Sequence, residues 1–104
     1  MSRYRLSHQA DRDLEEIADY LGERNPAAAV RVLEALHQTF TLLAKSPLLG
    51  TLREDLRRDL RVFRSRKPAD GYLVFYYPIS EGVEIAMLLH GSRDYLGMFA
   101  RGER

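Results

Sequence analysis

Cysteine and tryptophan are absent from this sequence of 104 residues, and lysine occurs only twice. The lack of cysteine excludes disulfide bonds, thiolate zinc sites and cysteine nucleophiles, and it suits a reducing compartment. The sequence also lacks any run of about 18 apolar residues, and no apolar segment follows the two arginines near its N-terminus. We therefore expect a cytoplasmic protein with neither a membrane span nor a secretory signal peptide.

Net charge is also scarce, because 16 basic and 15 acidic residues leave a balance of +1. Bulk charge therefore gives no reason to expect nucleic-acid binding. The charges are unevenly placed, with seven basic and three acidic side chains in residues 53–67 and six acidic and one basic in residues 11–23. Nearly all the cations are arginine, which suits bidentate contacts with carboxylate or phosphate, although a GC-rich genome would produce the same bias.

What is present fits one domain, 1–104, with a modest core, since 45% of the residues are apolar and 30% are charged. In the first half the apolar residues recur at helical spacing. One helix is predicted from its N-cap Ser7 to about Gly22 or Arg24, and a second from Asn25-Pro26 to Ser46-Pro47. Because few residues join them, the two helices should form an antiparallel hairpin.

The second half changes to the period of β-strands. Together with an N-terminal edge strand, the predicted strands are residues 1–6, 60–65, 72–79 and 83–89. The 72–79 strand is expected to be central, alternate apolar residues of 83–89 are expected on one face, and residues 51–59 suit a short helical turn. The predicted fold is α+β: a two-helix hairpin packed on one face of a small twisted antiparallel sheet, in the order β-α-α-β-β-β, with a short C-terminal tail or helix.

Common catalytic motifs and metal-ligand spacings are missing. The three histidines, at positions 8, 37 and 90, are scattered, and no nucleotide-binding glycine motif or serine-hydrolase motif occurs. We therefore expect no metal and no cofactor. The carboxylates of the first helix are expected to form a solvated face; they include Asp13, Glu16, Asp19 and Glu23.

The end of the last predicted strand combines polar side chains with a glycine, in the order His90-Gly91-Ser92-Arg93-Asp94-Tyr95. Polar groups at the rim of a sheet can bind or react. Arg93 is placed to grip a carboxylate or phosphate with its planar fork. The alternative is that Arg93 and Asp94 cap and tether the C-terminal tail.

Five segments of the sequence resemble, in the same order, the ParE branch of the RelE/ParE superfamily of type II toxins. They are LSHQADRDLEEIADYL, NPAAAVRVLEAL, LLAKSPLLG, YLVFYYPI and VEIAMLLHGSRDY, with the closing Leu-His-Gly-x-Arg-Asp pattern, and the resemblance extends over residues 4–96. It implies a small toxin with two helices on an antiparallel sheet, neutralised by a ParD-like antitoxin. For ParE members it implies binding to DNA gyrase and arrest of replication, with DNA reached only through gyrase or the antitoxin.

RelE members of the same superfamily cleave messenger RNA on the ribosome, and this is the alternative function. Such cleavage needs groups that move protons and stabilise charge on the phosphate. The lysine pair typical of the RelE site has no counterpart here, so we favour a binding toxin over an enzyme. An inert stabilising partner module is a third interpretation.

The resemblance and the charge distribution together assign residues to expected surfaces. Target binding is expected from Arg61, Arg64, Arg93 and Tyr95, of which Arg61, Arg93 and Tyr95 would be catalytic in a ribonuclease. Two helices can cover only one face of the sheet, so the antitoxin is expected to cover the other face beside the basic cluster. Its expected contacts are Arg57, Arg58, Tyr72, Val74 and Tyr76.

Overall fold

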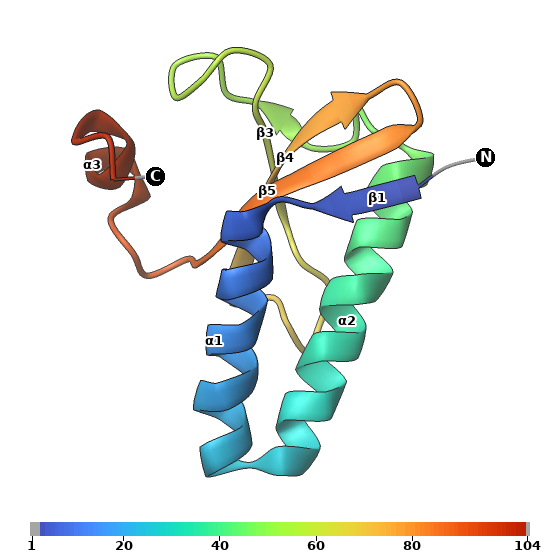
Figure 1. Cartoon of the computed structure of the whole chain (residues 1–104), viewed down its shortest axis with the longest axis vertical. Coiled ribbons are helices and arrows are strands. Elements are labelled where there is room, and N and C mark those ends of the chain that lie inside the picture. The colour runs from blue at the N-terminus through green and yellow to red at the C-terminus, as the bar shows by residue number, and fades with distance from the viewer. Residues whose placement is uncertain (1–2, 104) are drawn as a thin grey trace.

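The structure is a computed structural model that describes residues 3–103. A helical hairpin lies against a twisted sheet, and a short C-terminal helix lies apart from the hairpin (Figure 1). In chain order the elements are β1 (Arg3–Leu6), α1 (His8–Arg24), α2 (Pro26–Lys45), β2 (Thr51–Leu52), β3 (Arg61–Arg64), β4 (Tyr72–Ile79), β5 (Gly82–His90) and α3 (Tyr95–Ala100).

The helical hairpin forms where the sequence predicts it. Ser7 caps α1, because its hydroxyl oxygen accepts the Ala10 N–H at 3.0 Å. Asn25 alone joins the helices: its backbone N–H donates to Leu21 O, and its side chain accepts the Ala28 N–H at 3.1 Å. One residue thus ends α1 and begins α2, which forces the helices to run antiparallel.

The sheet has the order β1-β5-β4-β3-β2, so β4 is central and β1 is an edge strand, as predicted. The sheet is mixed rather than antiparallel, because β1 pairs with β5 in parallel. Residues 1 and 2 of the predicted first strand lie outside the described residues. Gly82 is required where these strands meet, since a Cβ atom there would lie 1.8 Å from the Arg3 carbonyl oxygen.

The prediction of a helical turn at 51–59 is wrong for its first two residues. Thr51–Leu52 forms β2, which pairs antiparallel with β3 at the sheet edge, and turns follow it. The leucine spacing that indicated a helical turn instead brings Leu56 and Leu60 back against the sheet.

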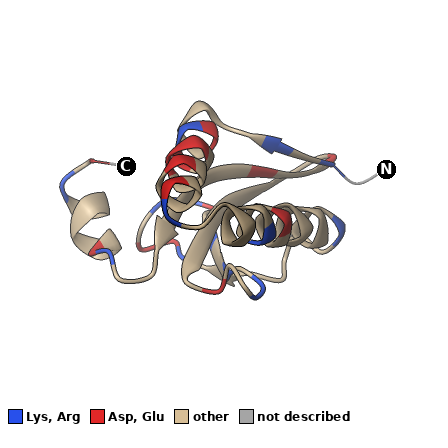
Figure 2. Ribbon diagram, turned by 90° about the horizontal axis from the view of Figure 1, so that it is seen from below, with Lys and Arg blue, Asp and Glu red and all other residues tan. Residues whose placement is uncertain are grey.

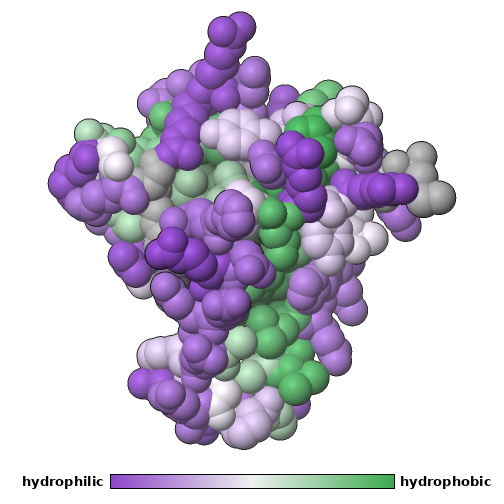
Figure 3. Space-filling model, in the orientation of Figure 1, coloured by the Kyte–Doolittle hydropathy of each residue, from purple (hydrophilic) through white to green (hydrophobic). Residues whose placement is uncertain are grey.

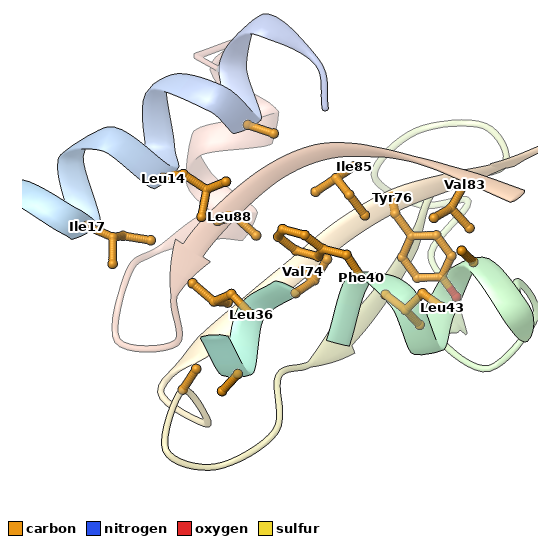
Figure 4. Close-up of a cluster of buried hydrophobic side chains, with 14 of the residues drawn as sticks. Leu14, Ile17, Leu36, Phe40, Leu43, Val74, Tyr76, Val83, Ile85 and Leu88 are labelled. Carbon is orange, nitrogen blue, oxygen red and sulfur yellow. The ribbon is translucent and has the colours of Figure 1, made fainter. Parts of the chain in front are cut away.

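The main core lies between the helices and one face of the sheet, here called the helix face. Figure 4 shows the side chains of both helices directed at strands β4 and β5. The cluster combines Leu14, Ile17, Leu36, Phe40 and Leu43 from the helices with Val74, Tyr76, Val83, Ile85 and Leu88 from the strands.

The opposite face of the sheet, here called the tail face, is covered by the chain itself. Phe75 and Met87 are buried there beneath Met98 of α3 and Leu60 of the β2–β3 connection. The expectation that a partner must cover this face of β4 is therefore wrong for its middle. This cover was not predicted from the sequence, because the apolar segment of the C-terminal tail is short.

A β-bulge in β5 divides the apolar residues of that strand between the two faces. Phe75 pairs with Met87 and Tyr76 pairs with Ile85, which leaves Ala86 as the extra residue. Val83 and Ile85 consequently contact the helix-face core, whereas Met87 and Leu89 contact the tail-face cluster. The prediction that all four share one face is wrong, because an extra residue shifts a period-2 pattern to the other face.

Charged and apolar residues are unevenly distributed over the two helices of the hairpin. Acidic residues are concentrated on α1 (Figure 2), as the sequence distribution predicts. An apolar strip runs along the helical hairpin between polar side chains in the face seen in Figure 3. Within residues 3–103, no helix is long and apolar enough to cross a lipid bilayer.

Candidate functional site

A cleft of about 560 Å³ lies between α1 and the end of β5. Helix α1 contributes one wall and the strand ends and the following turn contribute the other. Its floor includes the apolar side chains of Ile17 and Leu21, and its rim includes the oppositely charged Glu16 and Arg93. The lining residues are Asp13, Glu16, Ile17, Tyr20, Leu21, Tyr72, Leu88, Leu89, His90, Ser92 and Arg93.

Asp13 fixes α1 against the wall formed by β5. Its side chain is 2% exposed, and its Oδ2 accepts the Leu88 N–H at 2.9 Å while Oδ1 accepts from Gln9 Nε2. Ser7 adds a second link, because its hydroxyl donates to the Ala86 carbonyl at 2.7 Å. Both links serve backbone groups at or beside the β-bulge. The prediction of a solvated face is therefore wrong for Asp13.

Tyr72 and His90 form an aromatic corner of the cleft. They pair across β4 and β5, and their rings meet edge to face with centroids 5.3 Å apart. Burial raises the pKa of the Tyr72 phenol, so Tyr72 is a neutral hydrogen-bonding group near pH 7. His90 Nδ1 accepts the Ser92 N–H at 3.2 Å, which places the proton of the neutral imidazole on Nε2.

Arg93 stands at the exposed rim of the cleft. Its backbone N–H donates to the His90 carbonyl at 2.9 Å, which closes the turn, and its guanidinium reaches Met98 Sδ at 3.9 Å. Across residues 3–103, no carboxylate lies within 4.0 Å of this guanidinium. Asp94 does not orient it but caps α3 through the Gly97 N–H at 3.0 Å. The tether interpretation thus describes Asp94, and Arg93 contributes to the tether through its contact with Met98.

The tail helix α3 is held by arginine–aromatic contacts. Arg53 lies over the Tyr95 ring at 5.9 Å and Arg57 lies over the Phe99 ring at 5.0 Å. Both rings pack on Phe75 of the tail face, at 5.7 and 5.5 Å between centroids. Asp55 and then Tyr95 raise the pKa of Arg53 above its usual value, because both hydrogen-bond its charged form. The Tyr95 ring is therefore part of the packing that holds α3 on the tail face.

The two arginines assigned to β3 make local contacts. The Arg61 guanidinium donates to the carbonyls of Leu48 at 3.2 Å and Gly50 at 2.7 Å. Arg64 is exposed, and its guanidinium donates to the Asp70 carbonyl at 2.7 Å. Arg61 therefore holds the connection after α2, whereas Arg64 lies close to Gly91 at the end of β5.

The residues expected for a ribonuclease are not gathered into one site. Arg61 pairs with Tyr76, whereas the turn bearing Arg93 follows the pair Tyr72–His90, about 13 Å farther along β4. Tyr95 packs on the tail face, on the other side of the sheet from Tyr76. One phosphate therefore cannot contact all three side chains in this conformation.

The expected antitoxin contacts also separate by burial. Val74 and Tyr76 are each 0% exposed beneath the helices, so they present no surface to a partner. The prediction for these two residues is corrected, because alternation along β4 directs them to the helix face. Arg57, Arg58 and Tyr72 retain accessible surface.

Several residues of the cleft were not predicted from the sequence. Asp13, Ile17 and Tyr20 recur at spacings of four and three, which is a signal that Asp13 lies on the inner side of α1. No local pattern indicated that Ser92 or Arg53 would contact His90 and Tyr95. Among residues 3–103, no group of three or more His, Cys, Asp or Glu side chains is placed to hold a metal ion.

Comparison with known proteins agrees with this architecture. Residues 4–95 match the family described as ParE toxin of type II toxin-antitoxin system, parDE. Toxin ParE1 of Caulobacter vibrioides is 34% identical over 101 residues, which cover 93% of this chain and all of that protein. A chain of the chromosomal ParDE TA system from P. aeruginosa shares the fold, with a TM-score of 0.70 at 14% identity over 86% of this chain and 96% of that chain. This chain belongs to the ParE toxin family of type II toxin-antitoxin systems.

Proposed function

We propose that this ParE-family toxin is a binding toxin that arrests growth by inhibiting DNA gyrase and is neutralised by a ParD-like antitoxin. The chain belongs to the ParE family, and this supports gyrase as the target, since the resemblance to ParE members implies binding to gyrase. The observation that carries the choice of mechanism is the exposed Arg93 at the rim of the α1–β5 cleft.

The cleft is suited to binding rather than to RNA cleavage. Arg93 offers a permanent positive charge, and no carboxylate among the described residues lies within 4.0 Å of it. Tyr20 and Tyr72 offer aromatic surface in the same cleft. The separation of Arg61, Arg93 and Tyr95 argues against a shared catalytic site. Arg93 and the cleft therefore form the proposed target contact, with Arg64 nearby on β3.

A ParD-like antitoxin is the proposed second partner. The exposed Arg58 and the half-buried Arg57 lie in the basic segment 53–67, which favours acidic side chains on the antitoxin. An antitoxin segment that folds on binding would contact these arginines and the tail helix beside them.

The proposed target is tested by inducing the toxin alone and measuring plasmid supercoiling and transcript cleavage in parallel. Gyrase inhibition predicts altered supercoiling, filamentation and induction of the DNA-damage response. Unchanged plasmid topology together with codon-positioned cuts in messenger RNA would establish the ribonuclease alternative instead.

The role of Arg93 is tested by Arg93→Ala. We expect growth arrest to be lost with antitoxin affinity unchanged and the melting temperature only slightly lowered, because the exposed side chain makes, among residues 3–103, no ion pair within 4.0 Å and only one weak contact, with Met98 Sδ. Arg31→Ala, which removes an exposed arginine from α2, is the matched control and should remain toxic. A fully toxic Arg93→Ala would remove Arg93 from the target contact.

A further inference from the structure

Three leucines are exposed on the connection between α2 and β3. The exposed fractions are 70% for Leu48, 49% for Leu49 and 45% for Leu52, and these residues are called the leucine patch. Single exposed leucines are common on protein surfaces, but a group of them marks an interaction site. The other large exposed apolar side chains among the described residues, such as Val30 and Leu96, lie on separate elements.

Arg61 brings the leucine patch together. Leu52 pairs with Arg61 across β2 and β3, so their side chains share a face of the sheet. The Arg61 guanidinium also donates to the Leu48 and Gly50 carbonyls. Arg61 therefore lies beside Leu52 and also holds the backbone that carries Leu48 and Leu49.

The connection is anchored to the buried Tyr76 by hydrogen bonds although it displays apolar side chains. The buried Tyr76 hydroxyl accepts the Gly50 N–H and donates to the Pro47 carbonyl, both at 2.8 Å. A Cβ atom at position 50 would lie 2.7 Å from this hydroxyl, so only glycine fits there. A surface held in one conformation before binding avoids the entropic cost of ordering, which favours tight association.

The surrounding charges indicate the chemistry of the partner. Residues 45–61 carry five basic and three acidic side chains, a balance of +2. A second copy of this chain would set two positively charged surfaces against each other, which disfavours a dimer through this face. An acidic segment with apolar side chains complements both the charge and the leucines.

We propose that the leucine patch is the docking surface for an acidic amphipathic segment of the antitoxin, an inference that rests on the function proposed above. The basic residues at positions 53, 57 and 58 follow the patch in the sequence. Arg53 and Arg57 lie over the Tyr95 and Phe99 rings on the tail face, so a segment that contacts both them and the leucines passes around the β2 edge of the sheet. Antitoxin contact is thus assigned to the β2 edge of the sheet, apart from the target cleft beside α1.

The test measures binding of the purified toxin to the product of its neighbouring gene by calorimetry. Leu48→Glu should weaken binding at least about 30-fold, the effect of losing one central apolar contact, and Leu48→Lys should weaken it less because its charge suits an acidic partner. Val30→Glu changes an equally accessible aliphatic residue on α2 and should bind like the unaltered toxin. In cells, Leu48→Glu should still arrest growth and should no longer be rescued by the antitoxin.

Three results would overturn the inference. Leu48→Glu that binds the antitoxin within about twofold of the unaltered toxin would place the antitoxin elsewhere. Loss of toxicity with unchanged antitoxin binding would assign the patch to the target. A dimer of the unaltered toxin that Leu48→Glu converts to a monomer would assign it to a second copy. If the unaltered toxin neither arrests growth nor binds its neighbour's product, the proposed function itself fails, an outcome distinct from a defect confined to the leucine variants.

Discussion

Asp13 shows how one buried carboxylate serves both stability and the cleft. Its Oδ2 accepts the Leu88 N–H beside the β-bulge, where the strand ladder is interrupted. Hydrogen bonds to charged groups contribute more than bonds between neutral groups, because the acceptor carries a full charge. The wall of the cleft therefore depends on a side chain that an apolar helix stripe would not include.

We predict that Asp13→Ala lowers the free energy of unfolding by about 1.5–3 kcal/mol, because the Leu88 N–H loses its acceptor. Asp13→Asn keeps an oxygen acceptor and should lose less. Asp19→Ala, at an exposed position on the same helix, should change it by less than about 0.5 kcal/mol. Urea unfolding measures all three, and equal effects of Asp13→Ala and Asp19→Ala would contradict the structural role.

Tyr76 gives a second prediction at the scale of the residue. Tyr76→Phe leaves the Gly50 N–H and Pro47 carbonyl without their partner, so we expect a loss of about 1–3 kcal/mol in the free energy of unfolding. Tyr77→Phe, at a half-buried neighbour on β4, is the control. Thermal or urea unfolding at pH 7 measures the difference, and equal stabilities of the two variants would contradict it.

The same residue predicts a pH dependence. Burial raises the pKa of the Tyr76 phenol above its ordinary value near 10. The folded state therefore retains this proton where the unfolded state loses it, and the stabilisation that is present below pH 10 declines as pH rises above that value. Melting temperatures between pH 8 and 11 should fall more steeply for the native chain than for Tyr76→Phe, and parallel curves would refute this.

At the scale of elements, α3 acts as the cover of the tail face. Met98 is 6% exposed over Leu73, Phe75 and Met87, while Leu96 on the same helix is 52% exposed. A six-residue helix has little intrinsic stability in water, so its position depends on these contacts.

We predict that Met98→Ala undocks α3 without unfolding the helical hairpin. Amide hydrogen exchange should accelerate in residues 94–101 and stay slow in α1 and α2, because only the cover loses its buried anchor. Leu96→Ala is the matched control and should leave exchange unchanged. Uniform acceleration across the chain would show that α3 belongs to the global folding unit.

The elements differ in how far the sequence predicts them. Both helices were predictable, because their signals are local: the N-caps Ser7 and Asn25 and the 3.6-residue period of apolar residues. The direction of β1 was not predictable, because its pairing with β5 joins residues about 80 positions apart. The bulge at Ala86 was not predictable either, because its stabilising partners, Ser7 and Asp13, lie on another element.

The candidate site divides in the same way. Arg93 was predicted as a rim residue because glycine and polar residues follow an apolar strand. Arg61 was predicted as a binding residue from its charge alone, whereas its guanidinium is occupied by the Leu48 and Gly50 carbonyls. Local pattern identifies where a strand ends, but it does not reveal which carbonyl a long side chain will reach.

At the scale of the whole molecule, the charges are divided between an acidic helix, α1, and the basic segment 53–67. We predict that association with the antitoxin slows as salt concentration rises, because screening weakens the attraction of its acidic side chains to Arg57 and Arg58. Arg57→Ala combined with Arg58→Ala should reduce this salt dependence, and Arg31→Ala should not.

Stopped-flow association at 50 and 300 mM salt measures these rates. A salt dependence that survives removal of both arginines would place the electrostatic contact elsewhere. Deleting the C-terminal half of the antitoxin should abolish binding if that half supplies the acidic segment, and unimpaired binding of the shortened antitoxin would refute this.

The parallel pairing of β1 with β5 has a consequence for the synthesis of the toxin. The first strand made can complete its pairing only with the last, and Ser7 and Asp13 find their backbone partners only at Ala86 and Leu88. Translation proceeds from the N-terminus at about 5–20 residues per second, so α1 is made seconds before β5, which forms the other wall of the cleft. A chain whose synthesis stops before β5 therefore lacks the cleft, and the folded toxin arises only after β5 has been made.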